Sequence, residues 1–182
     1  MPDETIIADE EAKYPSLEDR ADWIYYGEPV SKNRTYDIEG VKSEDIDIED
    51  LDRKQVEEIA EKYEVLSGKW VLEYPRKDID NEWTILKEMM RSVEKPNYAK
   101  VSSRIQSDNF HKNRRESPDV SKRNHVICVY TKDFRDKDDV MDVLENLKDW
   151  GFDPIGYKED VKTVLDIYSD TENLDEYLHN LK

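Results

Sequence analysis

The chain has 182 residues, of which 40 % are charged and 36 % hydrophobic, and its formal net charge is −17. This length fits one domain with a proper core plus an arm. No run approaches the roughly 20 apolar residues of a membrane span, and the acidic N-terminus lacks the positive charge of a signal peptide. The single cysteine, Cys128, cannot form an internal disulfide. We therefore expect a cytoplasmic protein without membrane contact.

The first third of the chain is strongly acidic. Residues 1–60 hold 19 Asp and Glu against 7 Lys and Arg, with the apolar residues scattered. Such a stretch buries too little apolar surface to offset its ordering entropy. We predict an acidic, partly ordered arm over residues 1–50 and one α+β domain over residues 51–182. The aromatic cluster Trp23–Tyr26 can form a strand or an anchor that packs on this domain.

Hydrophobic periodicity predicts the elements of the domain in chain order. Apolar residues at helical spacing alternate with short β-rich runs, and Pro75 and Gly151 mark two of the ends. The predicted helices cover residues 49–63, 78–93, 136–150 and 174–181. The predicted strands cover residues 69–74, 99–105, 125–131, 154–158 and 163–168, and residues 106–124 read as a basic loop.

A basic island interrupts the acidic chain. Between Lys95 and Lys132 nine Lys and Arg face three Asp and Glu, which gives this segment a net charge of +6. A cluster of positive charge in an otherwise acidic protein usually binds an anionic ligand. The alternative is that the island pairs with acidic segments of the same protein.

Signatures of common enzymes are missing from the sequence. Five glycines leave little room for a phosphate-binding loop, and one cysteine with three scattered histidines makes a zinc site improbable. We expect neither a metal nor a cofactor, and the sequence leaves catalysis undecided, leaning against it.

Three stretches resemble a known family: GKWVLEYPRKDIDNEWTILKE, AKVSSR, and HVICVYTKDFRDKDDVMDVLENLKDWGF followed by PIGYKEDVKTVLDIYS. Over roughly residues 67–169 they are similar to the basophilic-leukaemia-expressed protein family, which has archaeal and eukaryotic members and no known function. The resemblance implies the fold of the cap-binding translation initiation factor 4E, a curved, mostly antiparallel sheet with helices on its convex side. Some relatives carry the label of phosphothreonine lyases.

An antiparallel sheet of this kind predicts a basic ligand-binding surface. Strand parity places Lys100, Ser102 and Arg104 on one face, beside the basic loop. A concave face lined by Lys and Arg suits phosphate or a nucleotide. The candidate ligand-binding residues are Lys100, Ser102, Arg104, Arg114, Arg115, Arg123, His125, Tyr130, Lys132 and Lys158.

The tryptophans depart from the pattern of cap-binding factors, which stack a base between two loop tryptophans. Here Trp83 and Trp150 occupy apolar faces of predicted helices, so we expect both to be buried. Recognition of an mRNA cap is therefore not expected.

Three functions follow. The first is a binding module for a phosphorylated small molecule or RNA, in which Tyr130 or Tyr157 can stack a base. The second is an enzyme acting on a phosphorylated substrate, with Lys100 as base and His125 as acid. The third is an adaptor whose acidic arm binds a protein partner or covers the basic face.

Overall fold

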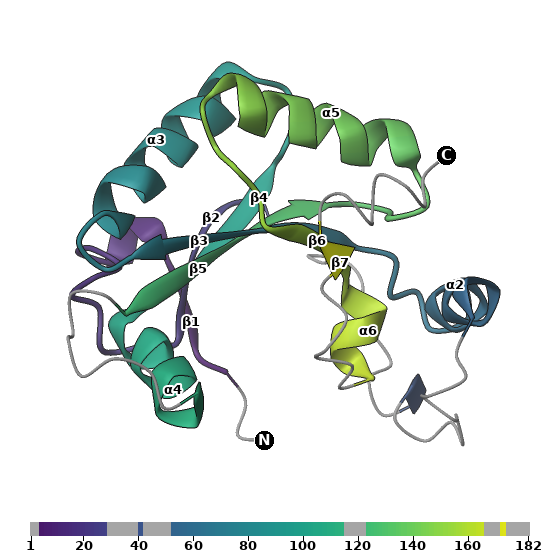
Figure 1. The fold of residues 1–182 in the computed structure, drawn as a ribbon, viewed down its shortest axis with the longest axis horizontal. Helices are drawn as coiled ribbons and strands as arrows, with labels where there is room; N and C mark the ends of the chain where they lie inside the picture. Colours follow the sequence, from purple (N-terminus) through teal and green to yellow (C-terminus); the bar gives the residue numbers. More distant parts are fainter. Residues whose placement is uncertain (1–3, 29–39, 42–51, 115–122, 166–171, 174–182) are drawn as a thin grey trace.

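The computed structural model describes residues 4–28, 40–41, 52–114, 123–165 and 172–173. An open sheet runs through it in the order β1-β2-β4-β5-β3-β6-β7 (Figure 1). β1 is parallel to β2, and the remaining neighbours are antiparallel. The strands are β1 (Ile6–Ala8), β2 (Trp23–Gly27), β3 (Gly68–Pro75), β4 (Tyr98–Ser102), β5 (Asn124–Thr131), β6 (Gly156–Glu159) and β7 (Glu172–Asn173).

The helices divide between the two sides of this sheet. α3 (Ile79–Ser92) and α5 (Lys137–Asp149) cover one face, whereas α4 (Arg104–Arg114) and α6 (Asp160–Val164) flank the other (Figure 1). A short 3-10 helix, η1, spans Asp9–Glu11, and α2 (Arg53–Lys62) lies beyond α6. The predicted α+β class and mostly antiparallel sheet are confirmed, but the helices are not restricted to one face.

The hydrophobic core lies between the sheet and the pair α3 and α5. The two long strands, β3 and β5, present their fully buried side chains to these helices at alternate positions, as strand geometry requires. Trp70 of β3 donates from its indole Nε1 to the Val140 carbonyl of α5 at 3.0 Å. The buried members on the helices include Trp83, Leu86, Met89, Val143, Leu144 and Leu147.

Most of the predicted elements between residues 69 and 151 are confirmed. β3, α3, β5 and α5 stand within about two residues of their predicted bounds, and Gly151 has the positive φ of +84° that a helix C′ position favours. The predicted helix over residues 174–181 lies outside the described residues.

Three predictions about local structure are wrong. Residues 104–105 do not continue β4, and the predicted basic loop begins as the helix α4, because the Ser103 hydroxyl accepts a hydrogen bond from the Gln106 amide at 3.2 Å and caps it. Residues 163–164 of the predicted strand over residues 163–168 belong instead to α6, since Val161 and Leu165 are buried at helical spacing, and residues 166–168 lie outside the described part of the chain. Trp150 is 38 % exposed, because α5 ends at Asp149 and leaves the ring beyond its last buried turn.

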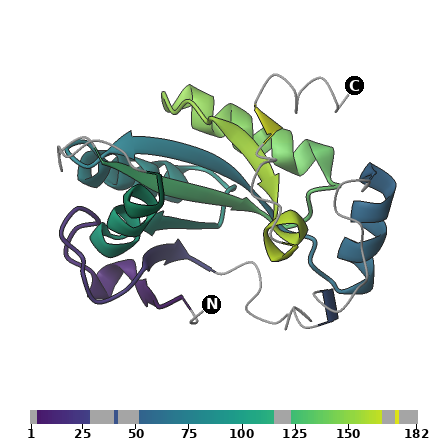
Figure 2. The ribbon, with the colours of Figure 1, turned by 60° about the horizontal axis from the view of Figure 1, so that its bottom comes forward.

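Two strands come from the predicted N-terminal arm. The aromatic cluster forms β2, which pairs with β4 over five residues and contributes the fully buried Ile24 to the core. Figure 2 shows β1 and β2 at one end of the molecule and α2 at the other. The division of the chain at residue 50 stays a prediction, although the sheet includes strands from both sides of it.

Candidate functional site

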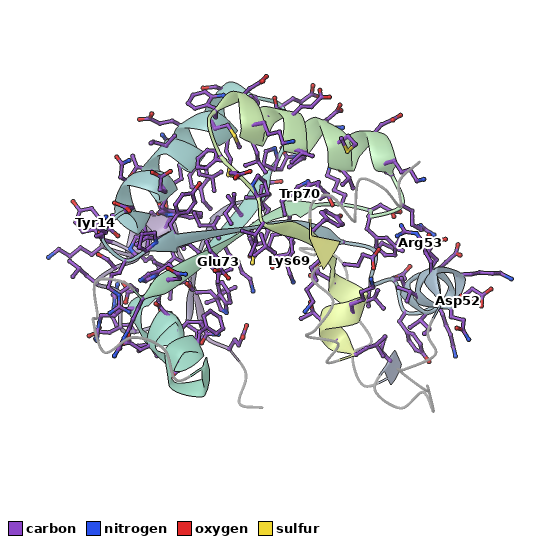
Figure 3. The ribbon with its side chains drawn as sticks, viewed as in Figure 1. Tyr14, Asp52, Arg53, Lys69, Trp70 and Glu73 are labelled. Carbon is purple, nitrogen blue, oxygen red and sulfur yellow. The ribbon has the colours of Figure 1, made fainter. Side chains whose placement is uncertain are left out.

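The side of the sheet facing away from α3 and α5 carries three lysines on neighbouring strands. Lys69 of β3 stands directly opposite Lys158 of β6, and Lys100 of β4 stands opposite Cys128 of β5. Strand alternation assigns the three lysines to one side, together with Tyr130. Figure 3 shows Lys69 on the side of β3 away from α5 and Trp70 on the side toward it. We call the surface formed by Lys69, Lys100, Lys158, Tyr98 and Tyr130 the lysine face.

A carboxylate of α6 fixes the amine of Lys69. The Lys69 Nζ lies 2.6 Å from the Asp160 carboxylate and 3.3 Å from the Thr163 hydroxyl. Burial opposes the charge on Lys69, but the nearby Asp160 carboxylate raises the pKa of the amine above its ordinary value. Lys69 is therefore a buried ammonium held in one position.

Lys158 has the opposite electrostatic environment. It is 8 % exposed, and burial together with the neighbouring Lys69 ammonium lowers its pKa below the ordinary value for lysine. The Asp160 carboxylate acts in the other direction without reversing this shift. Lys69 and Lys158 stand on directly opposed strand positions, where like charges destabilise a sheet.

Lys100 occupies the end of the lysine face next to α4. Its Nζ lies 3.9 Å from the centre of the Trp23 ring, a cation–π contact, and 4.0 Å from the Glu4 carboxylate. Trp23 in turn packs edge-on against Phe110 of α4 with 6.2 Å between ring centres. The Trp23 indole Nε1 is buried and has no hydrogen-bond partner among the described residues.

A pocket of about 680 Å³ adjoins the lysine face, and Tyr98 and Tyr130 belong to both. The rings of Tyr98 and Tyr130 are 5.1 Å apart between centres, and the Lys69 Nζ lies 5.6 Å from the centre of the Tyr130 ring. Both tyrosines line the pocket, and the predicted site residue Lys132 lies on its exposed rim. The pocket lies where β4 begins and β5 ends, between the last turn of α3 and the first turns of α5.

Two predicted arginines lie elsewhere, around the carboxylate of Asp108. Arg123 binds this carboxylate at 2.7 Å, and Arg76 binds it at 2.6 Å. Arg104 lies 3.9 Å from the same carboxylate and pairs with Asp19 at 2.9 Å. The prediction that Arg104 shares the face of Lys100 is wrong, since Arg104 begins α4. This arginine cluster is already paired with acidic side chains.

Two further predicted residues, Ser102 and His125, are fully buried. The Ser102 hydroxyl accepts a hydrogen bond from the Val126 amide at 2.9 Å. His125 uses both ring nitrogens, because Nδ1 lies 2.8 Å from the Ser102 carbonyl and Nε2 accepts from the Arg76 Nε at 3.2 Å. Burial lowers the pKa of His125 to about 4, so the imidazole is neutral near pH 7.

The proposed base and acid of the enzymatic alternative do not face each other. Lys100 is opposite Cys128, and His125 is three residues from Cys128 along β5, so their side chains point to opposite faces of the sheet. This geometry does not support Lys100 and His125 as one catalytic pair. The side chain of Arg114 and all of Arg115 lie outside the described residues.

Sequence reasoning missed Lys69 and Arg76 because both lie outside the basic island. The sequence did contain a signal for Lys69, because this charged residue directly precedes the apolar run Trp70–Leu72 of the predicted strand 69–74. Among the residues that the structure describes, no group of three or more His, Cys, Asp or Glu has the arrangement to hold a metal ion. In the same part of the chain no helix is long and apolar enough to cross a membrane.

The burial of His125 predicts a pH dependence of stability. Its pKa is about 4 in the folded chain and 6.5 for an unperturbed histidine, so the unfolded chain binds the additional proton first and stability falls as the pH drops through this window. Between pH 6.5 and pH 5 the loss from this group is about 1 to 2 kcal/mol. Chemical denaturation of the wild type and of His125→Gln at both pH values measures it. The variant is expected to lack this increment, and an equal loss of stability in the two proteins contradicts the assignment.

The fold and the site define a class of protein: an open α+β sheet with two helices packed on one face and a lysine-rich opposite face. The model of the family described as basophilic leukemia-expressed protein Bles03 matches residues 39–166. The chain therefore belongs to this family, as its sequence resemblance indicated. A search of curated proteins finds no match.

Proposed function

We propose that the chain is a non-enzymatic binding module that holds a phosphate-bearing ligand, either a nucleotide, RNA or a phosphorylated partner, on the lysine face. The observation that carries the proposal is the placement of Lys69, Lys100 and Lys158 within four adjacent strands of one sheet surface, in a protein with a net charge of −17. Phosphate oxygens supply negative charge that offsets the repulsion within the opposed pair Lys69 and Lys158.

Aromatic side chains give the same surface a place for a ring. Tyr98 and Tyr130 adjoin Lys69 and line the pocket, so a ligand with phosphate on the lysines has its remaining part beside two tyrosines. Stacking of a base on an aromatic ring contributes about 1–3 kcal/mol. In this proposal the fold is of the cap-binding initiation factor 4E type, and the lysine face corresponds to its ligand-binding side.

The other two functions receive less support. The enzymatic alternative, in which the chain acts like a phosphothreonine lyase, loses its acid, because His125 is buried on the opposite face. For the adaptor, one relevant contact is that of Glu4 with Lys100 at 4.0 Å, which is a single exposed carboxylate at the edge of the lysine face. An acidic arm that binds a protein partner remains an expectation, since residues 29–39 and 42–51 lie outside the described part.

Replacing two lysines tests the proposal. We expect Lys100→Ala with Lys158→Ala to weaken binding of a fluorescent RNA or of adenosine triphosphate by at least about tenfold, because a hydrogen bond to a charged group contributes about 1.5–3 kcal/mol. Binding is expected to weaken with added salt. Fluorescence anisotropy at low ionic strength measures both effects.

The matched control is Lys77→Ala with Lys148→Ala, which removes the same charge from exposed positions off the lysine face. The affinity of this control variant is expected to stay within about twofold of that of the wild type. Salt screens the effect of surface charges that lie far from the binding site. Equal affinity of both double variants and the wild type contradicts the proposal, and equal weakening by both variants shows that only net charge matters.

A further inference from the structure

We propose that Trp23 and Lys100 form a subsite for a terminal phosphate group at the end of the lysine face next to α4. This inference rests on the proposed function, and it adds which end of the surface holds the phosphate and what kind of phosphate it is. The ligand class is a phosphate monoester, whose phosphate has three acceptor oxygens. The Trp23 indole Nε1 and the Lys100 Nζ each donate a hydrogen bond to one of these oxygens.

The first support is the indole nitrogen of Trp23, which is buried without a partner. Trp23 is 5 % exposed, and its Nε1 makes no hydrogen bond among the described residues. The indoles of the two other buried tryptophans are satisfied. Trp70 donates to the Val140 carbonyl at 3.0 Å, and Trp83 donates to the Asp9 carboxylate at 2.6 Å. A buried donor without an acceptor costs free energy, and an acceptor from outside the chain removes this cost.

The second support is the position of Lys100 over the same ring. Its Nζ lies 3.9 Å from the centre of the Trp23 ring, and its side chain is only 15 % exposed. Within the described part of the chain this ammonium makes no hydrogen bond, since the Glu4 carboxylate with which it pairs is 4.0 Å away. The ammonium and the indole N–H are thus two neighbouring donors without an acceptor.

The third support is the Glu4 carboxylate itself. The side chain of Glu4 is 56 % exposed, and its Oε1 accepts a hydrogen bond from the Gln106 amide of α4 at 3.5 Å. Its position shows that a negatively charged group can approach Lys100. Phosphate oxygens that replace this carboxylate come within the 2.7–2.9 Å or so of a charge-assisted hydrogen bond.

The burial of the two donors selects the kind of phosphate. Phe110 of α4 packs edge-on against Trp23, with 6.2 Å between ring centres, so α4 borders the subsite on one side. Because both donors are largely buried, the phosphate has to reach them from the end of a ligand. A phosphodiester within RNA continues into the chain on both sides and requires an open surface. A terminal phosphate therefore fits this subsite, and an internal one does not.

The remainder of the ligand extends toward the pocket of about 680 Å³. Tyr98 lies two residues from Lys100 along β4, which corresponds to about 7 Å on the same side of the strand. The Tyr98 ring is 6.0 Å from that of Tyr25 and 5.1 Å from that of Tyr130 between centres, and Tyr98 and Tyr130 line the pocket. A mononucleotide can thus place its phosphate at Lys100 and its base beside these tyrosines.

The indole N–H signals of the four tryptophans test the proposal in the wild-type protein. Isotope-labelled full-length protein is titrated with adenosine 5′-monophosphate, and the four signals are assigned from single Trp→Phe variants. We expect a saturable downfield shift of the Trp23 indole proton, because this proton gains a hydrogen bond to an anion. The signals of Trp70, Trp83 and Trp150 are expected to stay in place, since the first two indoles already have partners and the third is remote from the lysine face.

Single variants test each donor. Trp23→Phe keeps an aromatic ring beside Lys100 and removes the N–H, so we expect binding of adenosine monophosphate to weaken by at least about tenfold. Lys100→Gln is expected to weaken binding to a similar degree and to abolish the shift of the Trp23 signal. Lys148→Gln makes the same change of charge at an exposed position of α5 and is expected to alter neither. Far-ultraviolet circular dichroism confirms that each variant is folded, and the wild-type titration does not depend on any of them.

The titration also separates this inference from the proposed function. If adenosine monophosphate shifts the backbone amides of Lys69 and Lys158 while the Trp23 indole signal stays in place, the lysine face binds phosphate and the Trp23 subsite is overturned. If cyclic adenosine monophosphate, whose phosphate is a diester, moves the Trp23 signal equally, the restriction to monoesters is overturned. The absence of any saturable shift at low salt contradicts both proposals.

Discussion

Replacing Trp83 by alanine is expected to lower the free energy of unfolding by about 3 to 5 kcal/mol. The ring is 1 % exposed between α3 and the sheet, and its indole Nε1 donates to the Asp9 carboxylate at 2.6 Å. The substitution removes a large buried ring and leaves that carboxylate with Lys87 as its remaining partner. Urea denaturation followed by circular dichroism measures the change.

Trp150→Ala is the matched control in the same chain. Its ring is 38 % exposed at the end of α5, so we expect a change within about 0.5 kcal/mol, as for other surface substitutions. A large loss for Trp150→Ala, or a small one for Trp83→Ala, contradicts the packing described above.

Removal of residues 1–28 is expected to abolish cooperative unfolding. The deletion takes away β1 and β2, exposes the edge of β4 along five residue pairs, and removes the fully buried Ile24. It also removes Asp9, which binds Trp83 and Lys87. A sheet that loses both an edge strand and part of its core buries too little apolar surface to fold well.

Calorimetry of the truncated chain measures this effect. A single sharp transition near that of the full chain contradicts the expectation and supports a separable arm. The variant Asp9→Asn, with the strands intact, separates the loss of the hydrogen bonds from the loss of the sheet edge, and we expect it to cost only about 1 to 3 kcal/mol.

The sequence predicted the central elements because their periodicity is strong. The continuous apolar run of β5 and the helical spacing of Trp83, Leu86 and Met89 leave few alternatives. The predictions failed where a few polar residues decide the conformation. Ser103 with Gln106 starts α4 in a segment of low apolar content, and the β-branched residues of α6 resemble a strand.

The candidate site was predicted in part. The candidate residues Lys100, Tyr130 and Lys158 share one side of the sheet, but this follows from the register between strands, whereas the parity argument covered only Lys100, Ser102 and Arg104 within one strand. The pairing of β3 with β6 brings Lys69 to Lys158 from distant parts of the chain, and local patterns do not contain such a contact. Likewise, charge counting did not distinguish arginines paired with Asp108 from lysines on the sheet.

Phosphate binding on the lysine face is tested most directly by chemical-shift mapping. Backbone amide spectra of the isotope-labelled protein are recorded during titration with adenosine triphosphate and, separately, with tripolyphosphate. We expect saturable shifts concentrated at Lys69, Lys100 and Lys158, with small shifts at the start of α3 and the end of α5, which lie away from the pocket. Shifts that cluster instead at Arg76 and Arg123, or an absence of saturable shifts at low salt, contradict phosphate binding on this surface.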